Sequence, residues 1–354
     1  MKRRLKEKRE MKKTIADGIA GCLYAGGLAD AMGGATEALS IREIHDKFGG
    51  NITDFEENQE SIYFTGNDAG EVTDDTSQMY EMAKEVAEKG ESFTVVDAAA
   101  SLVRWSKSYP KYYPRNAGGT TRYVIEEIEK GADPIEIGKQ GGIYRRGTTN
   151  GAAMRIAPAG LRHPGDVDKA IQLAITMTQP SHGTQHAYAG ACAIAAGISR
   201  ALLPDAQMMD VVKACIYGAK EGFERGMKEA RQASGLHILP KIYKGVELAL
   251  DFEDMEEYLK KLDYYVGNDG TIQSSVAAAI SIFIATDADP VKTAIYAANL
   301  GGDTDTIGCI ANYLSGAYSG INAIPENWIQ IFRKANPKID FDGLTERFCE
   351  VLNL

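Results

Sequence analysis

The feature that most constrains the fold is a hydrophobic period close to that of an α-helix, which recurs along most of the 354-residue chain. Met79, Met82 and Val86, for example, are spaced so that they share one face of a helix. Alternating strand and helix units, which a doubly wound sheet requires, are absent. Only short stretches near Ile52 and over 61–64 are open to either an extended or a loop conformation. The pattern predicts helices over 14–32, 75–89, 95–106, 167–177, 185–203, 208–224, 255–262, 273–285, 291–300, 306–318 and 327–335.

The predicted helices are rich in alanine and glycine, which allows buried helices to pack closely at several crossing angles. No Pro/Ser-rich linker and no repeat of fixed period divides the chain, so we expect one all-α domain over residues 14–354. The first thirteen residues, MKRRLKEKREMKK, carry eight Lys or Arg against two Glu and have no apolar stripe. We therefore expect residues 1–13 to form a basic, flexible N-terminal arm.

Composition excludes several classes of partner and points to a cytoplasmic protein. The formal net charge of -10 argues against a surface for nucleic acid. No run of about eighteen apolar residues predicts a membrane span, and Asp17 interrupts the one N-terminal segment that resembles an export signal. The five cysteines are scattered and form no CxxC pair, which is typical of buried thiols in a reducing compartment.

Two acidic motifs stand where a loop runs into a predicted helix, VTDDTSQM at 72–79 and GGDTDTIG at 301–308. Helix N-capping explains either motif alone at least as well as metal binding, because Asp and Thr accept hydrogen bonds from free backbone amides. Adjacent carboxylates repel each other, however, and a bound cation relieves that repulsion. The presence of two such motifs therefore favours a metal site.

The donors that these motifs offer are all carboxylate or hydroxyl oxygens, which favour Mg²⁺, Mn²⁺ or Ca²⁺ over zinc. Four carboxylates are enough to hold two cations that share a water or substrate oxygens. We expect Gly301 and Gly302 to leave backbone room for the approach of the ions. A calcium loop over 264–276 is excluded, because Tyr265 and Gly267 stand where an EF-hand needs acidic ligands.

A third motif, RRGTTNGAAMRIAPAG at 145–160, is a glycine-bracketed loop that leads into a helix of small residues. Its backbone amides suit an anion, and Arg145, Arg146 or Arg155 would add positive charge. The alternative is an ordinary turn in which Asn150 caps the helix, and the sequence leaves both interpretations open.

A fourth motif, PSHGTQHAYAGA at 180–191, places His182 and His186 one helical turn apart. Such a pair can ligate a metal ion, but no glutamate follows His182 as the HExxH arrangement requires. We therefore expect His182 to lie on the substrate side or to cap a helix.

Together with GLADAMGGATE at 27–37 and NLGGDTDTIGCIANYLSGAYSG at 299–320, these motifs resemble the ADP-ribosylglycohydrolase family. That family includes the dinitrogen-reductase-activating glycohydrolases and the ADP-ribosylarginine and ADP-ribosylserine hydrolases. The resemblance extends over roughly residues 14 to 320. It implies a single large multi-helix orthogonal bundle that holds two Mg²⁺ or Mn²⁺ ions.

The resemblance also implies roles for individual residues. Glu37 matches a family glutamate that serves as ligand, gate or general base, and we expect Glu37, Asp74 and Asp303 to act in catalysis. The chain departs from the family at Ala29, where relatives have glycine, and at Gln179, where many have histidine. The implied metal ligands are Thr73, Asp74, Asp75, Asp303, Asp305 and Thr306, and the implied substrate-binding residues are Thr149, Asn150, Gly151 and His182.

The function implied is hydrolysis of the glycosidic bond at the anomeric carbon of a ribose. The expected substrate is an ADP-ribosylated protein or a small ADP-ribosyl or ribosyl compound, with the pyrophosphate held by the loop over 147–151. One alternative is a nucleosidase or ribosyl-glycoside hydrolase that uses the same metals on small ribosides. The second is a non-catalytic ADP-ribose-binding or structural protein, since fold alone does not establish activity.

Overall fold

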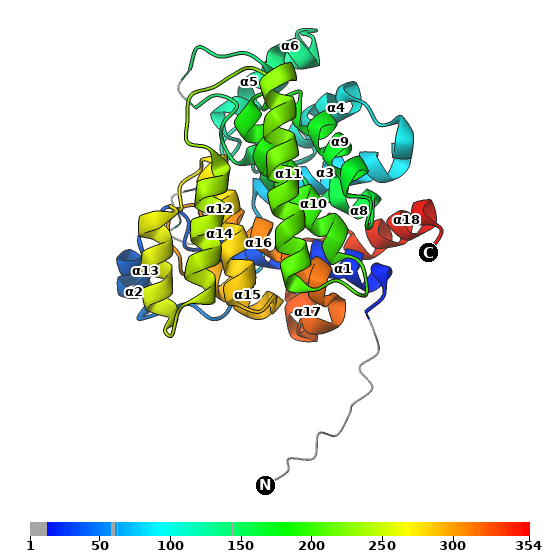
Figure 1. Ribbon diagram of the computed structural model, residues 1–354. Coiled ribbons are helices and arrows are strands. Elements are labelled where there is room, and N and C mark those ends of the chain that lie inside the picture. The colour runs from blue at the N-terminus through cyan, green and yellow to red at the C-terminus, as the bar shows by residue number, and fades with distance from the viewer. Residues whose placement is uncertain (1–12, 58–60, 62, 144) are drawn as a thin grey trace.

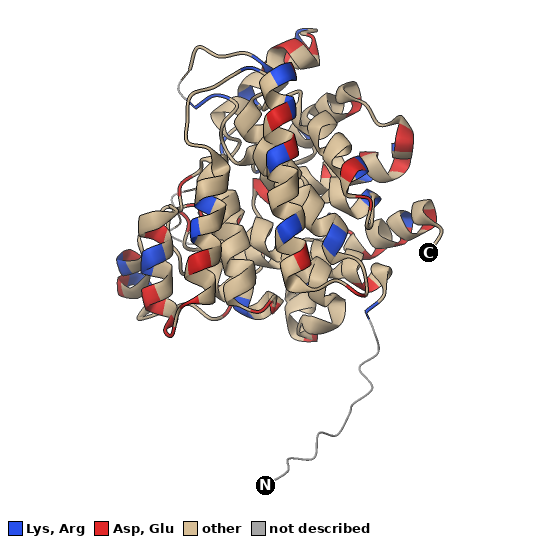
Figure 2. Cartoon of the chain, in the orientation of Figure 1, with Lys and Arg blue, Asp and Glu red and all other residues tan. Residues whose placement is uncertain are grey.

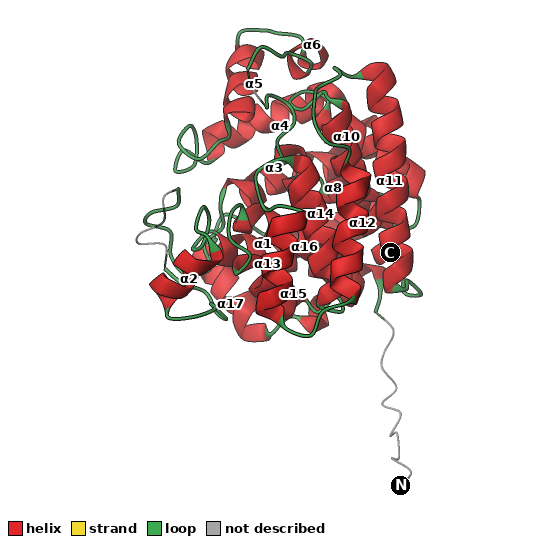
Figure 3. Cartoon of the chain, turned by 60° about the vertical axis from the view of Figure 1, so that its left-hand side comes forward, coloured by secondary structure: helices red, strands yellow, loops and turns green. Residues whose placement is uncertain are grey.

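The computed structural model describes residues 13–57, 61, 63–143 and 145–354. Over these ranges the chain forms eighteen α-helices, two short 3₁₀-helices and no strand, which confirms the predicted all-α class (Figure 3). The α-helices are α1 (Ile15–Gly33), α2 (Ile41–Phe48), α3 (Asp74–Lys89), α4 (Val95–Ser108), α5 (Gly119–Glu129), α6 (Pro134–Gly138), α7 (Gly151–Met154), α8 (Ala157–Arg162), α9 (Val167–Thr178), α10 (Gln185–Ala201), α11 (Met208–Glu229), α12 (Ile238–Leu250), α13 (Met255–Tyr265), α14 (Ile272–Ala285), α15 (Pro290–Ala298), α16 (Thr304–Ser319), α17 (Glu326–Ala335) and α18 (Phe341–Leu352). The 3₁₀-helices are η1 (Gly90–Ser92) and η2 (Ile321–Ala323).

Four helices, α1, α10, α14 and α16, form the centre of the molecule (Figure 1). In α10 every residue except Arg200 is buried, and in α14 every residue except Ala285 is buried. Helices that are apolar on all sides are stable only when other helices cover them. The longest helix, α11, packs along α10 and exposes its charged side, so it forms part of this cover.

The helices α1 and α16 lie antiparallel and almost in backbone contact. A Cβ atom on Gly21 would lie 2.4 Å from the carbonyl oxygen of Gly316, and one on Gly316 would lie 2.1 Å from that of Gly21. Only glycine permits this approach. Because the two helices are antiparallel, the C-terminal end of α1 at Gly33 comes to lie beside the first turn of α16.

The predicted N-terminal arm falls almost wholly outside the described residues, since 1–12 are not among them. Its last residue, Lys13, donates from Nζ to the carbonyl oxygens of Ala201 and Ala317, each at 2.6 Å. These carbonyl groups lie in the last turns of α10 and α16, where the helix dipole favours a positive charge. Lys13 therefore joins the ends of two central helices.

The described parts of the stretches left open between extended and loop conformations, around Ile52 and 61–64, are loop and turn. Charged residues of both signs are spread over the outer helices (Figure 2). Among the described residues, no helix combines the length and the hydrophobicity needed to cross a membrane.

Candidate metal centre and its neighbouring cavity

The two acidic motifs form the N-termini of α3 and α16, as the sequence predicts, but their capping differs. Thr73 is the N-cap of α3, and its hydroxyl accepts a hydrogen bond from the backbone amide of Asp75 at 3.2 Å. Asp303 is the N-cap residue of α16, yet its side chain accepts no capping hydrogen bond from a backbone amide of that helix. Capping thus accounts for Thr73 and leaves the carboxylate of Asp303 available for another role.

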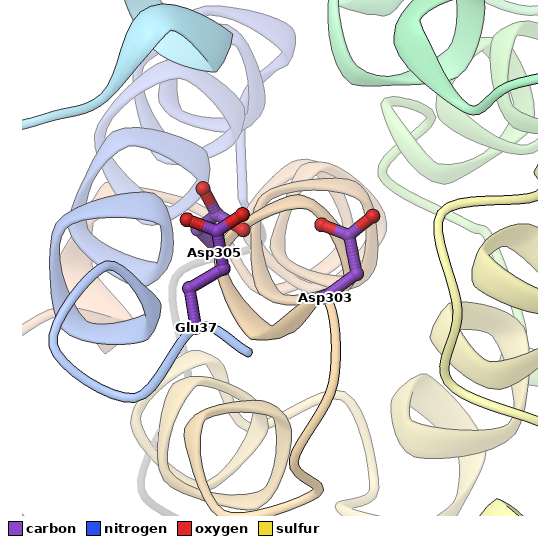
Figure 4. Close-up of side chains that lie close together, drawn as sticks. All are labelled: Glu37, Asp303 and Asp305. Atoms are coloured by element: carbon purple, nitrogen blue, oxygen red, sulfur yellow. The ribbon is translucent and has the colours of Figure 1, made fainter. Parts of the chain in front are cut away.

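Three carboxylates meet in front of α16 (Figure 4). One oxygen from each of Glu37, Asp303 and Asp305 lies within 4.8 Å of the others, which is close enough for all three to hold one ion. Glu37 lies on the turn after α1, and the next two residues of this turn form backbone hydrogen bonds with Gly302. The amide of Ala38 donates to the carbonyl oxygen of Gly302 at 2.8 Å, and the amide of Gly302 donates to that of Leu39 at 2.9 Å.

The remaining predicted ligands surround this group. Asp74 and Asp75 lie in the first turn of α3, and Thr306 lies in the first turn of α16 with 4% of its surface exposed. The charges of Asp75 and Glu37 both raise the pKa of Asp305, so the two motifs lie close together in space. The structure therefore brings Asp74, Asp75 and Thr306 near the three carboxylates of this group, whereas the Thr73 hydroxyl is engaged in capping α3.

Two buried carboxylate oxygens in this group, Glu37 Oε2 and Asp75 Oδ2, have no hydrogen-bond partner. Such an atom is rare in native proteins and costs free energy unless a ligand satisfies it. The all-oxygen donor set suits a hard divalent cation. The residues present therefore fit the metal ions that the sequence predicts.

Burial and mutual repulsion raise the pKa of every carboxyl group here. Burial, followed by the charge of Asp30, raises the pKa of Asp74 to about 8. For Asp75 and Asp305 the pKa lies well above its ordinary value, because burial and neighbouring carboxylates act in the same direction. The pKa of Glu37 is raised well above its ordinary value by burial and by the charges of Asp303, Asp74 and Asp30. A cation would reverse these shifts by favouring the ionised forms.

One further carboxylate supports the centre without facing it. Asp30, on α1, is fully buried and accepts hydrogen bonds from the backbone amides of Thr73 (3.1 Å) and Thr76 (3.0 Å). It therefore caps α3 from a neighbouring helix. No role for Asp30 was expected from the sequence, although an aspartate inside an Ala/Gly-rich helix is a signal that such a partner exists.

The glycines of the second motif allow close contacts between backbone segments; their expected role in the approach of the ions stays a prediction. Gly301 and Gly302 have φ values of +77° and +72°, a region that side chains rarely allow. A Cβ atom on Gly302 would lie 2.4 Å from the carbonyl oxygen of Asn268, and one on Gly301 would lie 2.8 Å from that of Leu39. The glycines let three loops meet beside the carboxylates.

The predicted substrate loop touches the centre through Asn150. Its side-chain amide donates to Asp303 Oδ2 and to Ser275 Oγ, each at 2.8 Å. Thr149 Oγ1 lies 2.9 Å from His182 Nε2. Because only 1% of His182 is exposed, this histidine lies behind the loop and would act on a ligand through Thr149. Gly151 begins the short helix α7 and packs against the imidazole ring.

A cavity of about 510 Å³ opens next to this loop. Thr148 and Asp269 line it, and the position of a Cβ atom on Gly270 lies 3.0 Å from Asp303 Oδ2, so the cavity adjoins the carboxylate centre. Its wall carries four cationic side chains, Arg145, Arg146, Arg231 and Lys241.

Three of these four cations form no ion pair within the described residues. Arg145 pairs with Asp269 at 3.2 Å, whereas Arg146, Arg231 and Lys241 pair with no described carboxylate. Lys241 Nζ donates to Ser274 Oγ at 2.9 Å instead. The Arg146 guanidinium stacks on the ring of Tyr123 at 3.8 Å. Arg155, which the sequence offered as a third anion ligand, is instead 2% exposed and does not line this cavity. A cavity with unneutralised guanidinium groups is suited to an anionic ligand.

Comparison with known proteins agrees with these features. A profile of the ADP-ribosylglycohydrolase family matches residues 11–353. The uncharacterized protein YegU of Escherichia coli is 31% identical over 86% of this chain and 89% of its own length. Human ADP-ribosylhydrolase ARH3 is 28% identical over 88% of this chain and 87% of its own length. ADP-ribosyl-[dinitrogen reductase] glycohydrolase of Rhodospirillum rubrum is 26% identical over 89% and 90%.

A solved structure described as an ADP-ribosylglycohydrolase-related protein complex has the same fold. It superposes with a TM-score of 0.64 and 23% identity, and the match covers 95% of this chain and 98% of that one. At this level of identity the likeness establishes the fold alone.

Proposed function

Because this chain belongs to the ADP-ribosylglycohydrolase family and is a glycosidic-bond hydrolase, we propose that it releases ADP-ribose from a modified protein side chain or a small acceptor. We further propose that it does so with two Mg²⁺ or Mn²⁺ ions held by the predicted ligands. The observation that carries the proposal is a centre of buried carboxylates directly beside a cationic cavity of nucleotide size.

Cleavage at the anomeric carbon of a ribose passes through a state with positive charge on the sugar. Carboxylates in front of α16 stabilise that charge, and Asp303 is held in place for this by Asn150. Glu37 is the proposed acceptor of a proton from the water that attacks the anomeric carbon, while the bond to the leaving group breaks and the leaving group takes up a proton. Its Oε2 is buried beside the other carboxylates and has no hydrogen-bond partner among the described residues. Divalent cations, when bound, supply the positive charge that keeps these carboxylates ionised and polarise coordinated oxygens.

The cavity supports ADP-ribose over a small riboside as the substrate. If the ribose of ADP-ribose lies at the carboxylates, the rest of the molecule can extend past Asn150 and Thr148 into the cavity. There the loop over 147–151 and the guanidinium groups of Arg146 and Arg231 can bind its phosphates. A pyrophosphate matches that charge, whereas a nucleoside leaves both guanidinium groups unpaired.

A product screen tests the proposal. Purified protein with Mg²⁺ or Mn²⁺ is incubated with ADP-ribosylated arginine and serine peptides, small ADP-ribosyl compounds and nucleosides, and the products are separated by chromatography. We expect free ADP-ribose from one of the ADP-ribosyl substrates and none after chelation of the metals. Turnover of nucleosides alone would identify a nucleosidase, and binding of ADP-ribose without any turnover would identify a non-catalytic protein.

Substitutions in the cavity separate the two hydrolytic alternatives. Arg231→Gln and Arg146→Gln should raise KM for the ADP-ribosyl substrate by about tenfold or more, since each removes a charge-assisted contact. Arg225→Gln is the matched control, because Arg225 lies on α11 and contacts Gln172 away from the cavity. Unchanged KM in both cavity variants would contradict a pyrophosphate at this place.

A further inference from the structure

A seven-residue segment, Thr149 to Arg155, reaches both halves of the carboxylate centre. At one end Asn150 donates to Asp303, which belongs to the α16 half. At the other end Arg155 Nη1 donates to Gln78 Oε1 at 2.6 Å, and Gln78 Nε2 donates to Asp74 Oδ2 at 2.8 Å. Asp74 belongs to the α3 half, so the segment links the two motifs.

The other side of the Arg155 guanidinium leads back to the same segment. Nη2 donates to Ser181 Oγ at 2.7 Å and lies 3.3 Å from His182 Nδ1. The opposite ring nitrogen of His182, Nε2, lies 2.9 Å from Thr149 Oγ1. A chain of hydrogen bonds therefore runs from Asp74 through Gln78, Arg155 and His182 to Thr149. Thr149 is next in sequence to Asn150, which donates to Asp303.

The chemistry of arginine favours one tautomer of His182. Arginine only donates, so the 3.3 Å contact from Arg155 Nη2 calls for an accepting Nδ1, and Ser181 Oγ, which accepts from Arg155, lies 2.8 Å from the same Nδ1. The imidazole is then neutral with its proton on Nε2, and it donates to Thr149 Oγ1. This leaves the hydroxyl proton of Thr149, which is partly exposed, free to be donated to a ligand.

The path is buried along its length. Gln78, Ser181 and His182 are each 1% exposed and Arg155 is 2% exposed. A buried guanidinium without a directly paired carboxylate is costly, and replacing such a group by an apolar side chain is often stabilising. Packing alone therefore does not explain why an arginine stands here. A planar group that donates in two directions does explain it, because it can hold Gln78 and Ser181 at once.

We propose that Arg155 is a positioning residue that couples the metal-binding carboxylate of Asp74 to the substrate loop at Thr149 and Asn150, with His182 as the link. This inference rests on the proposed function for the meaning of the carboxylate centre. It predicts that a change at His182, which contacts no described carboxylate, alters the affinity of the centre for a cation.

Titration with Mn²⁺ alone, followed by calorimetry, tests the coupling without any substrate. Arg155→Lys should weaken Mn²⁺ binding by about 10- to 100-fold, because lysine offers one donor nitrogen in place of the two separate ones that hold Gln78 and Ser181. His182→Ala should weaken it by about 2- to 30-fold. The double variant should bind no more weakly than Arg155→Lys, since both changes break the same path. The matched control is Arg162→Lys, a mostly buried arginine on α8 that pairs with Glu91.

Thermal unfolding of each metal-free variant separates coupling from general damage. A purely structural role would lower Tm in the variants and leave the Mn²⁺ affinity of the folded protein at the wild-type value. That result for His182→Ala, or additive losses in the double variant, would overturn the proposal. With an ADP-ribosyl substrate, loosening of Asp74 should lower kcat and loosening of the loop should raise KM, so both are expected to change in Arg155→Lys.

A measurement on the wild-type protein keeps the proposal testable if the variants fail to fold. The ¹⁵N shifts of His182 should show a protonated Nε2 and an unprotonated Nδ1, as the path requires. A proton on Nδ1 would contradict it. The metal titration and the NMR measurement need no substrate. A wild-type protein that cleaves nothing in the product screen would therefore overturn the proposed function, while these two measurements would still decide whether Arg155 couples the carboxylates to the loop.

Discussion

The side-chain amide of Asn150 lies 2.8 Å from Asp303 Oδ2, although 153 residues separate them in the chain. This hydrogen bond joins the loop beside the cationic cavity to the carboxylate that begins α16. It also opposes the rise in the pKa of Asp303 that burial causes. One contact therefore serves both the shape and the charge of the centre.

Asn150→Ala removes this donor. We expect Mn²⁺ affinity to fall by about tenfold or more, since Asp303 then loses a partner that orients it and favours its charged form. Calorimetry with Mn²⁺ measures the change. Ser275→Ala, which removes the other partner of the same amide, is the control and should bind Mn²⁺ within a few-fold of wild type; equal losses in both variants would assign the effect to the loop instead.

Asp303→Asn and Asp305→Asn are each expected to abolish hydrolysis and weaken metal binding while helix content stays the same. In metal-free protein, Asp305→Asn should raise the free energy of unfolding, because burial and the neighbouring charges that raise the pKa of Asp305 no longer act on an ionisable group. In excess Mn²⁺ the order should reverse. Thermal unfolding with and without Mn²⁺ measures both, and the exposed Asp46→Asn should change neither.

The metal-free protein should lose stability as the pH rises. The pKa values of Asp30 and Asp74 are raised to about 6 and about 8 in the folded protein, against about 4 in an unfolded chain. At a pH between the unfolded pKa and the folded pKa of each group, the folded state therefore binds more protons than the unfolded state. The stability that these protonated groups contribute is fully present below about pH 4, and it is lost as the pH rises through about 6 for Asp30 and through about 8 for Asp74. Each group lowers the free energy of unfolding by about 1.4 kcal/mol per pH unit inside its window.

Chemical unfolding in the presence of a chelator, measured between pH 5 and pH 9, checks this slope. Saturating Mn²⁺ should flatten it, because the bound cation keeps the carboxylates ionised. A metal-free protein that becomes more stable over the same range would contradict the sign.

Gly33→Ala should damage the centre from the helix behind it. A Cβ atom there would lie 2.4 Å from the backbone nitrogen of Asp305 and 2.5 Å from its Cα atom, and no side-chain movement relieves such a contact. We expect a loss of about 1–3 kcal/mol in stability together with weaker Mn²⁺ binding. Gly118→Ala is the matched control, since nothing lies within 4 Å of the added methyl group.

Many helices with a recurring apolar pattern could be predicted from sequence, including α17, which buries only three residues, whereas others, among them α2, α5, α12 and α18, went unpredicted. The predicted 75–89 and 185–203 correspond to α3 and α10, since apolar residues recur along the whole length of both helices. α2 went unpredicted because it buries only Ile44, and α12 because Pro240 in its first turn interrupts the pattern. Stability in such helices comes from tertiary contacts that a local pattern does not contain.

The positions of the candidate ligands were accessible because each motif keeps its donors within a few residues. What joins the motifs was not. The cap that Asp30 provides to α3, and the path through Arg155 and His182, depend on how helices cross, and crossing angles are set by packing across the whole chain. For the same reason the contacts of Gly301 and Gly302 with neighbouring loops could not be foreseen from the sequence.

The contact between α1 and α16 also bears on how the protein is made. Asp74 and Asp75 leave the ribosome more than two hundred residues before Asp303. Until α16 has emerged and packed along α1, the carboxylates of α3 lack the carboxylates of α16 beside them. The proposed metal centre can therefore be complete only after most of the chain has been synthesised.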